Sequence, residues 1–284
     1  MRPSQFDLSQ PKSIREAATL ARGGAVLLGG GQALIQALRL RTAKPSQIVD
    51  LKSVSELSRE IQSTTDGLRI GALVTVTTLL ESDVVANKLP MMREAAGRLG
   101  DVQVRNRATV VGNVCWADPR ANLAVALLAY DAVLRVNDGQ SERVLPVAEC
   151  FSGFRAVALK PGEIVTAIDV PTAEPALPAA YLEFSRQRND LALVSMAVLR
   201  RRDGGHSVAA GGLAKTPLRL KGVESMLAAG GTGATIESLN AAIEISSIVS
   251  LGDPYGPLSY KVHVGAVLLS QILTKLNKNG ASHA

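Results

Sequence analysis

The stretch "LLGGGQALIQALRLRTAKPSQIVDL", residues Leu27–Leu51, decides the fold of the chain. A short apolar run ends at three consecutive glycines, Gly29 to Gly31, and apolar residues then recur at helical spacing. Lys44-Pro45 interrupts that spacing, and "QIVDL" follows as a second apolar run. The pattern therefore predicts a strand, a bare loop, a helix and another strand.

The three glycines have two interpretations. Backbone N–H groups at the start of a helix bind anions, and glycine lets a phosphate approach because it has no Cβ. The alternative is that the glycines only make a tight turn between strand and helix. Taken alone, the loop favours neither interpretation.

This segment matches neither of two known phosphate-binding loops in full. A P-loop requires Gly-Lys-Ser/Thr, and "GGGQALI" has neither the lysine nor the hydroxyl. A dinucleotide fingerprint fits better: Gly29 and Gly31 occupy its first two glycine positions, and Asp50 follows at the expected distance. Leu34 stands where the third glycine belongs, so this match is partial.

A second glycine-bearing segment, "NRATVVGNVCWADPRANL", spans residues 106–123. It offers the Thr109 hydroxyl, the Gly112 N–H and the Asn113 amide within five residues. Two separate loops of this kind suit the clamping of one extended, phosphate-containing ligand. Asp118-Pro119 has an alternative role as the start of the next helix.

Composition excludes several function classes. The 284 residues are 46% hydrophobic and 20% charged, which is typical of a globular chain. The net charge of +6 is spread along the chain, aromatic residues make up 3%, and no nucleic-acid motif accompanies them, so we expect no nucleic-acid partner. Apolar runs are too short for a membrane span and the N-terminus has no apolar core, so we expect a cytoplasmic protein.

The chain carries no recognisable catalytic or metal-binding motif. Two cysteines and three scattered histidines lack the spacing of metal sites, so no metal ligand is predicted. Nucleophile elbows and paired catalytic carboxylates do not occur either, so no catalytic residue is predicted. If the chain is part of an enzyme, a cofactor carries the chemistry.

Further elements follow from periodicity. Helices are expected over 12–22, with Ser13 as cap, and in "LPMMREAAGRLG" and "AVALLAYDA". Strands are expected in "AVLRVN", "ERVLPV" and "PGEIVTAIDVP", and a hairpin is expected to turn at Asp203-Gly204-Gly205. The proline-rich stretch 171–180 indicates a domain boundary. Beyond the hairpin, helices are expected over 222–229, 235–247 and 258–277.

Together these segments resemble the FAD-binding (medium) subunit of molybdenum hydroxylases, the family of xanthine dehydrogenase and carbon monoxide dehydrogenase flavoproteins. The first glycine segment is similar to the family's first FAD motif, and "RNRATVVGNVCWADPRANLAVALLAYDA" to its second. The segments "LKPGEIVTAIDVP", "RQRNDLALVSMAV" and "GDPYGPLSYKVHVGAVLL" also match, in order, over nearly the whole chain.

The resemblance implies an α+β fold in three parts. Two subdomains, 1–57 and 58–173, would form an FAD-binding domain of the vanillyl-alcohol-oxidase (PCMH) type. Residues 178–284 would form a small α+β C-terminal domain with a three-stranded sheet and helices.

The resemblance also implies which residues bind FAD. The first loop would hold the pyrophosphate through its backbone, the second would contact the pyrophosphate and ribityl chain, and Leu191 would lie against the isoalloxazine ring. The full set is Leu28, Gly29, Gly30, Gly31, Gln32, Ala33, Leu34, Leu99, Thr109, Gly112, Asn113, Asp118, Asn122, Val165 and Leu191.

Five positions depart from the family pattern. Ala33 replaces the usual serine, Val111 the first glycine of Gly-Gly-Asn, and Asn122 a frequent aspartate. Leu191 is aliphatic rather than aromatic, and Glu183 stands where a basic residue is common.

By this resemblance the chain is an electron-transfer subunit. It would pass electrons from the [2Fe-2S] clusters of a small subunit through FAD to an external acceptor, beside a large molybdenum-cofactor subunit, in a dimer of heterotrimers. The alternatives are a stand-alone NAD-dependent dehydrogenase that uses Asp50, and a scaffold subunit without cofactor.

Overall fold

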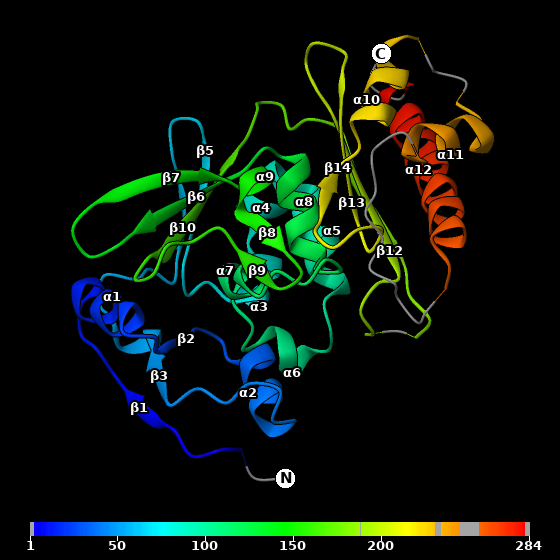
Figure 1. Ribbon diagram of the computed structural model, residues 1–284. Coiled ribbons are helices and arrows are strands. Elements are labelled where there is room, and N and C mark those ends of the chain that lie inside the picture. Colours follow the sequence, from blue (N-terminus) through cyan, green and yellow to red (C-terminus); the bar gives the residue numbers. More distant parts are fainter. Residues whose placement is uncertain (1–2, 188, 231–233, 245–255, 282–284) are drawn as a thin grey trace.

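The computed structural model describes residues 3–187, 189–230, 234–244 and 256–281. The chain folds into three successive α+β units, each with its own sheet, which follow one another from the N-terminus to the last long helix (Figure 1). This mixed helix-and-sheet architecture confirms the expected α+β fold class.

The first unit contains the glycine segment Leu27–Leu51. Its three-stranded sheet has the order β1-β3-β2, and both strand pairs are parallel. Ser13 caps the first helix by accepting a hydrogen bond from the Glu16 N–H at 3.2 Å, as predicted. The elements are β1 (Asp7–Ser9), α1 (Ile14–Arg22), β2 (Val26–Leu28), α2 (Gln32–Arg39), β3 (Gln47–Asp50) and the 3₁₀ helix η1 (Leu51–Ser53).

The second unit is a five-stranded antiparallel sheet in the order β4-β5-β10-β6-β7, accompanied by helices and a small hairpin. Its strands are β4 (Ile61–Ser63), β5 (Gly67–Gly71), β6 (Val133–Asn137), β7 (Glu142–Pro146), β8 (Phe151–Gly153), β9 (Ala156–Val157) and β10 (Ile164–Pro171). Its helices are α3 (Val76–Glu81), α4 (Asp83–Lys88), α5 (Pro90–Arg98), α6 (Val102–Arg105), α7 (Val110–Cys115), α8 (Asn122–Ala129) and α9 (Val147–Cys150).

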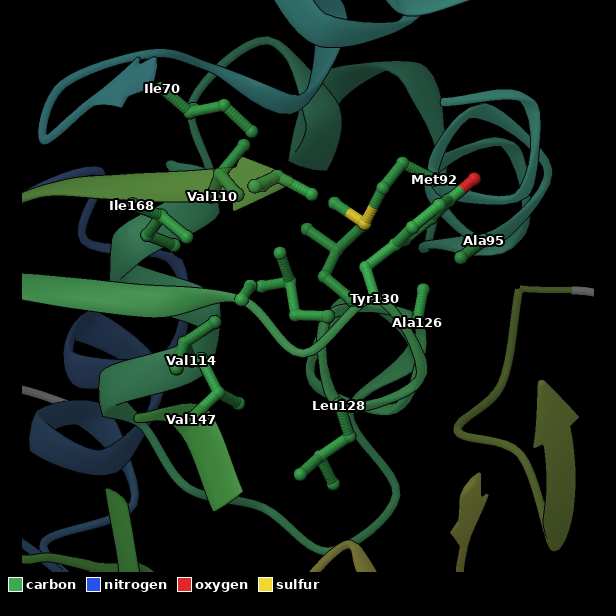
Figure 2. Close-up of a cluster of buried hydrophobic side chains, with 14 of the residues drawn as sticks. Ile70, Met92, Ala95, Val110, Val114, Ala126, Leu128, Tyr130, Val147 and Ile168 are labelled. Carbon is green, nitrogen blue, oxygen red and sulfur yellow. The ribbon is translucent and has the colours of Figure 1, made fainter. Parts of the chain in front are cut away.

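Helix α8 is the centre of the largest hydrophobic core. All eight of its residues are buried, which explains why every residue after Asn122 is apolar. Figure 2 shows Ala126 and Leu128 of α8 in the same cluster as Val110 and Val114 of α7. Because α7 carries the second glycine-bearing loop, this packing fixes the position of that loop.

The third unit differs slightly from the expected three-stranded sheet. Its order is β11-β12-β13-β14, where the fourth strand has only two residues. The β12–β13 hairpin turns at Asp203–Gly205, as predicted: the Gly205 N–H donates to Asp203 Oδ1 at 2.8 Å. The elements are β11 (Ala179–Phe184), β12 (Val194–Arg200), β13 (His206–Gly211), β14 (Leu218–Arg219), α10 (Lys221–Ala228), α11 (Ile236–Glu244) and α12 (Leu258–Ala281).

Parts of three sequence predictions fall outside the described residues, one of them being residue 188 of the segment "RQRNDLALVSMAV". The other two are residues 245–247 of the expected helix 235–247 and residues 252–255 of the matching C-terminal segment. The proposed boundaries of the three domains, 1–57, 58–173 and 178–284, stay predictions. No helix within the ranges that the structure describes is long and apolar enough to cross a membrane.

Glu94 of α5 ties the second unit to the third. One carboxylate oxygen accepts a hydrogen bond from the Tyr181 N–H of β11 at 2.8 Å. The other pairs with Lys275 Nζ of α12 at 2.5 Å. A single side chain therefore contacts both the sheet and the long helix of the third unit.

We predict that Leu127→Ala destabilises the chain by about 2–5 kcal/mol, because Leu127 is fully buried in α8 and its truncation leaves a cavity. The matched control is Leu40→Ala, since Leu40 is 68% exposed and its loss should change the unfolding free energy by less than about 0.5 kcal/mol. Urea denaturation measures both, and equal effects would contradict the assigned core.

Candidate cofactor-binding site

A cavity of about 380 Å³ lies between the first and second units, within the size range of cofactor sites. Both glycine-bearing loops contribute to its wall. Twelve of the fifteen residues predicted to bind FAD line it: Leu28, Gly29, Gly30, Gly31, Gln32, Ala33, Leu34, Leu99, Thr109, Gly112, Asn113 and Val165. The structure therefore brings together residues that lie up to 137 positions apart, from Leu28 to Val165.

The first wall ends in an uncapped helix. Gly31, the N-cap of α2, has φ +82°, which favours glycine, and no side chain caps the helix. The N–H groups of Gln32 and Ala33 in the first turn of α2 have no intrahelical partner. A helix start of this kind, turned toward a cavity, is suited to an anion.

The second wall presents polar groups on α7. Thr109 Oγ1 accepts a hydrogen bond from the Gly112 N–H at 3.0 Å, so the threonine caps α7 and its own O–H remains a donor. The buried Oδ1 of Asn113 accepts no hydrogen bond within the described part of the chain. A buried amide oxygen without a donor fits a site whose ligand carries hydroxyl groups.

The two walls meet backbone to backbone at Gly30. A Cβ at this position would lie 1.9 Å from the carbonyl oxygen of Arg107, which no side chain can occupy. This contact explains why the middle glycine is required.

Residues that the sequence analysis missed complete the cavity with apolar surface. Val111 lines the cavity where the family pattern has glycine, so its side chain narrows the cavity at the second wall. Of the others, Leu27, Leu51, Ala108, Cys115 and Trp116 lie within the two glycine-bearing segments, and the rest belong to stretches without a motif; the others are all apolar except Glu163. They are Val26, Leu27, Leu51, Ala72, Val104, Ala108, Cys115, Trp116, Val157, Leu159, Glu163 and Ile164.

The lining is electrically almost neutral. Its one ionisable carboxylate, Glu163, is paired bidentately with Arg143 at 2.7 Å for both contacts and also accepts from the Lys160 N–H. The Arg143 guanidinium lowers the pKa of Glu163 below its usual value. Burial raises the pKa of the Cys115 thiol to about 12, so this cysteine stays protonated at neutral pH. No Lys, Arg or His among the described residues lines this cavity.

Three predicted residues, Asp118, Asn122 and Leu191, do not line this cavity. Asp118 is buried and pairs with Arg120 at 3.4 Å and with Arg155 at 3.1 Å. Leu191 belongs to the third unit and is 43% exposed. The role of all fifteen residues in FAD binding stays a prediction.

Asn122 is instead bonded to a carboxylate of the third unit. Its Nδ2 donates to Glu183 Oε2 at 2.5 Å, and the Tyr181 hydroxyl donates to the same oxygen at 2.9 Å. Burial raises the pKa of Glu183 above its ordinary value of 4.5, and burial also raises the pKa of Tyr181. Two of the departures from the family pattern, Asn122 and Glu183, therefore contact each other.

Asp50, which a Rossmann-type site would direct to a ribose, is engaged elsewhere. Its Oδ1 accepts from the Lys52 N–H at 3.0 Å and pairs with Lys52 Nζ at 2.5 Å. Asp50 also lies outside the lining of the cavity. The three strands of the first unit do not extend into a doubly wound sheet.

Comparison with known proteins agrees with this geometry. Residues 4–173 match the family model of the FAD binding domain in molybdopterin dehydrogenase. Residues 179–276 match the model of the CO dehydrogenase flavoprotein C-terminal domain.

Similar proteins match most of the length of the chain. The chain is 30% identical to the carbon monoxide dehydrogenase medium chain of Afipia carboxidovorans over 97% of this chain and 98% of that one. It is 32% identical to the glyceraldehyde dehydrogenase medium chain of Sulfolobus acidocaldarius over 79% and 81%. The solved carbon monoxide dehydrogenase from Hydrogenophaga pseudoflava superposes with a TM-score of 0.88 at 30% identity, covering 96% of this chain and 98% of that one.

The fold and the site thus define an FAD-binding flavoprotein component of an oxidoreductase. More specifically, the chain belongs to the FAD-binding medium subunits of the molybdenum hydroxylases, the family that includes carbon monoxide and xanthine dehydrogenases.

We predict that Gly30→Ala weakens FAD binding at least about tenfold. The new Cβ would clash with the Arg107 carbonyl, overpacking of this kind costs about 1–3 kcal/mol, and the resulting shift would displace the loop that binds the cofactor. Gly97→Ala is the control, since a Cβ in α5 would meet its nearest neighbour, Leu80, at 3.9 Å. Isothermal titration of apoprotein with FAD compares the two variants. Equal affinities would show that the close contact is not needed.

A second prediction concerns the pH dependence of stability. Burial raises the pKa of Glu183 in the folded state, so the folded chain holds this proton more tightly than the unfolded chain does. The free energy of unfolding therefore falls as the pH rises from about 4.5 through the folded-state pKa. Glu183→Gln keeps an oxygen that accepts both hydrogen bonds and removes the charge. The variant should therefore gain stability over the wild type with rising pH, as measured by thermal unfolding from pH 5 to 8. A constant difference over this range would contradict the raised pKa.

Proposed function

We propose that this chain is the FAD-carrying electron-transfer subunit of a molybdenum-containing hydroxylase complex. The observation that carries the proposal is the cavity in which the uncapped start of α2 faces the polar residues of α7. The match of residues 4–173 to an FAD-binding family supports the same assignment. FAD, when bound, supplies the ability to accept electrons and to pass them on.

The residues of the chain bind and orient the cofactor. The backbone N–H groups of Gly30, Gly31 and Gln32 would hold the pyrophosphate, and Asn113 Oδ1 would accept a hydrogen bond from a hydroxyl of the ribityl chain or the ribose. The apolar side chains of Leu27, Val157 and other lining residues would exclude water from the ring systems.

The proposal includes partner subunits. Relatives named as medium chains or subunits imply assembly into complexes of several chains. We propose a large subunit with the molybdenum cofactor and a small subunit with two [2Fe-2S] clusters, arranged as a dimer of heterotrimers in the cytoplasm. Electrons would enter from the small subunit and leave to an external acceptor.

The direct test is flavin content. The chain, purified alone and together with the proposed partner subunits, should release close to one FAD per chain on denaturation, identified by chromatography against FMN and riboflavin. In the complex, reductant added at the molybdenum centre should bleach the flavin absorbance. A folded chain that releases no FAD and does not take it up would refute the assignment.

A further inference from the structure

A second hollow, of about 230 Å³, lies against the other face of the glycine loop. Gly29, Gly30 and Thr109 line both hollows, so the loop is the partition between them. The cations that the cofactor cavity lacks are found here: Lys52, Arg59 and Arg107 line the second hollow together with Leu73, Thr75, Thr78 and Asn106. The partition therefore has a neutral side toward the cavity and a positive side behind it.

Lys52 is held against the back of this partition. Its Nζ donates to the carbonyl oxygen of Gly29 at 3.3 Å and to Asp50 Oδ1 at 2.5 Å. The guanidinium of Arg59 donates to the Lys52 carbonyl at 3.0 Å, which fixes the backbone from which the lysine side chain extends. The ammonium group is thus anchored on two sides and directed at one peptide bond.

That peptide bond joins Gly29 to Gly30 and is trans. In a trans peptide the C=O and the N–H point in opposite directions. Because the Gly29 carbonyl accepts from Lys52 Nζ, the Gly30 N–H points away from that ammonium group, and Gly30 also lines the cofactor cavity on the other side of the loop. Between two glycines the opposite orientation of the peptide is also sterically accessible, and it would place a carbonyl oxygen against the cofactor's phosphate.

We propose that Lys52 is a positioning residue, which holds the Gly29–Gly30 peptide in the orientation that presents an N–H group to the FAD pyrophosphate. The inference rests on the proposed function, since it concerns the same loop. Lys52 acts from behind the loop and does not line the cofactor cavity. Its charge also favours a nearby anion, and Asp50 offsets part of that charge.

The test compares Lys52→Met, which keeps the length of the side chain but removes the donor, with Lys52→Arg, which keeps a donor and the charge. Lys52→Met should weaken FAD binding by about 10-fold to 100-fold, the range for losing a hydrogen bond to a charged group, and Lys52→Arg should recover most of it. Lys44→Met is the matched control, because Lys44 is exposed in the same unit and lines neither hollow.

Two further measurements separate positioning from a merely structural role. The ³¹P resonances of bound FAD should shift in Lys52→Met relative to the wild type and return to the wild-type positions in Lys52→Arg. The unfolding midpoint of the Lys52→Met apoprotein should be no lower than that of the Lys44→Met apoprotein. Unchanged FAD affinity and unchanged ³¹P resonances in Lys52→Met would overturn the inference. The inference would also be overturned if both Lys52 variants lost FAD affinity and both had a lowered unfolding midpoint.

Failure of the proposed function would look different. In that case the wild-type chain itself would bind no FAD, and the inference would fall with it. If instead the wild type binds FAD and only the Lys52 outcomes fail, the proposed function stands and the positioning role is refuted.

Discussion

The backbone contact between Gly30 and Arg107 is the constraint on which the site depends. It presses the first unit against the second so closely that no side chain fits between them. Two further bonds anchor the second loop within its own unit: the Val110 N–H donates to the Val74 carbonyl at 3.0 Å, and the Val76 N–H to the Ala108 carbonyl at 2.9 Å. The cavity therefore exists only while the two units are docked, because each supplies one of its walls.

The distribution of charge around this contact has a physical reason. A lysine or arginine inside a narrow, largely apolar cavity loses hydration, and the penalty is repaid only by an ideally placed partner. Peptide N–H groups at a helix start provide positive potential without a full charge to desolvate. The cavity accordingly offers an anion backbone dipoles on the inside, while Lys52, Arg59 and Arg107 lie exposed in the second hollow.

The third unit contributes to the same region without lining the cavity. The Gly212 N–H donates to the Pro119 carbonyl at 2.9 Å, and Glu183 accepts from Asn122, so the segment between α7 and α8 is bonded to the C-terminal sheet. Gly212 has φ +81°, and a Cβ there would lie 2.1 Å from the Leu193 carbonyl. The third unit therefore holds the chain just after α7, while α7 itself packs into the core around α8.

The sequence by itself determined the local structure of both loops. Apolar spacing and three glycines predicted β2, the bare turn and α2, and the similarity of two motifs to a known family indicated twelve residues that the fold then gathers around one cavity. The expected strand, turn and helix were confirmed because caps, turns and helix periods are short-range properties, whereas the role of the twelve residues in FAD binding stays a prediction. Only the tertiary structure decided that Val157, Leu159 and Ile164 are cavity wall, since apolar residues facing a cofactor and apolar residues facing a core have the same pattern. The two-residue strand β14 is too short to show a period, so it is visible only in the structure. The hydrogen-bond partners of Asn122 and Gly29 are likewise visible only there. Those partners, Glu183 and Lys52, come from other elements, and the direction in which a peptide or a side chain points is set by what packs against it.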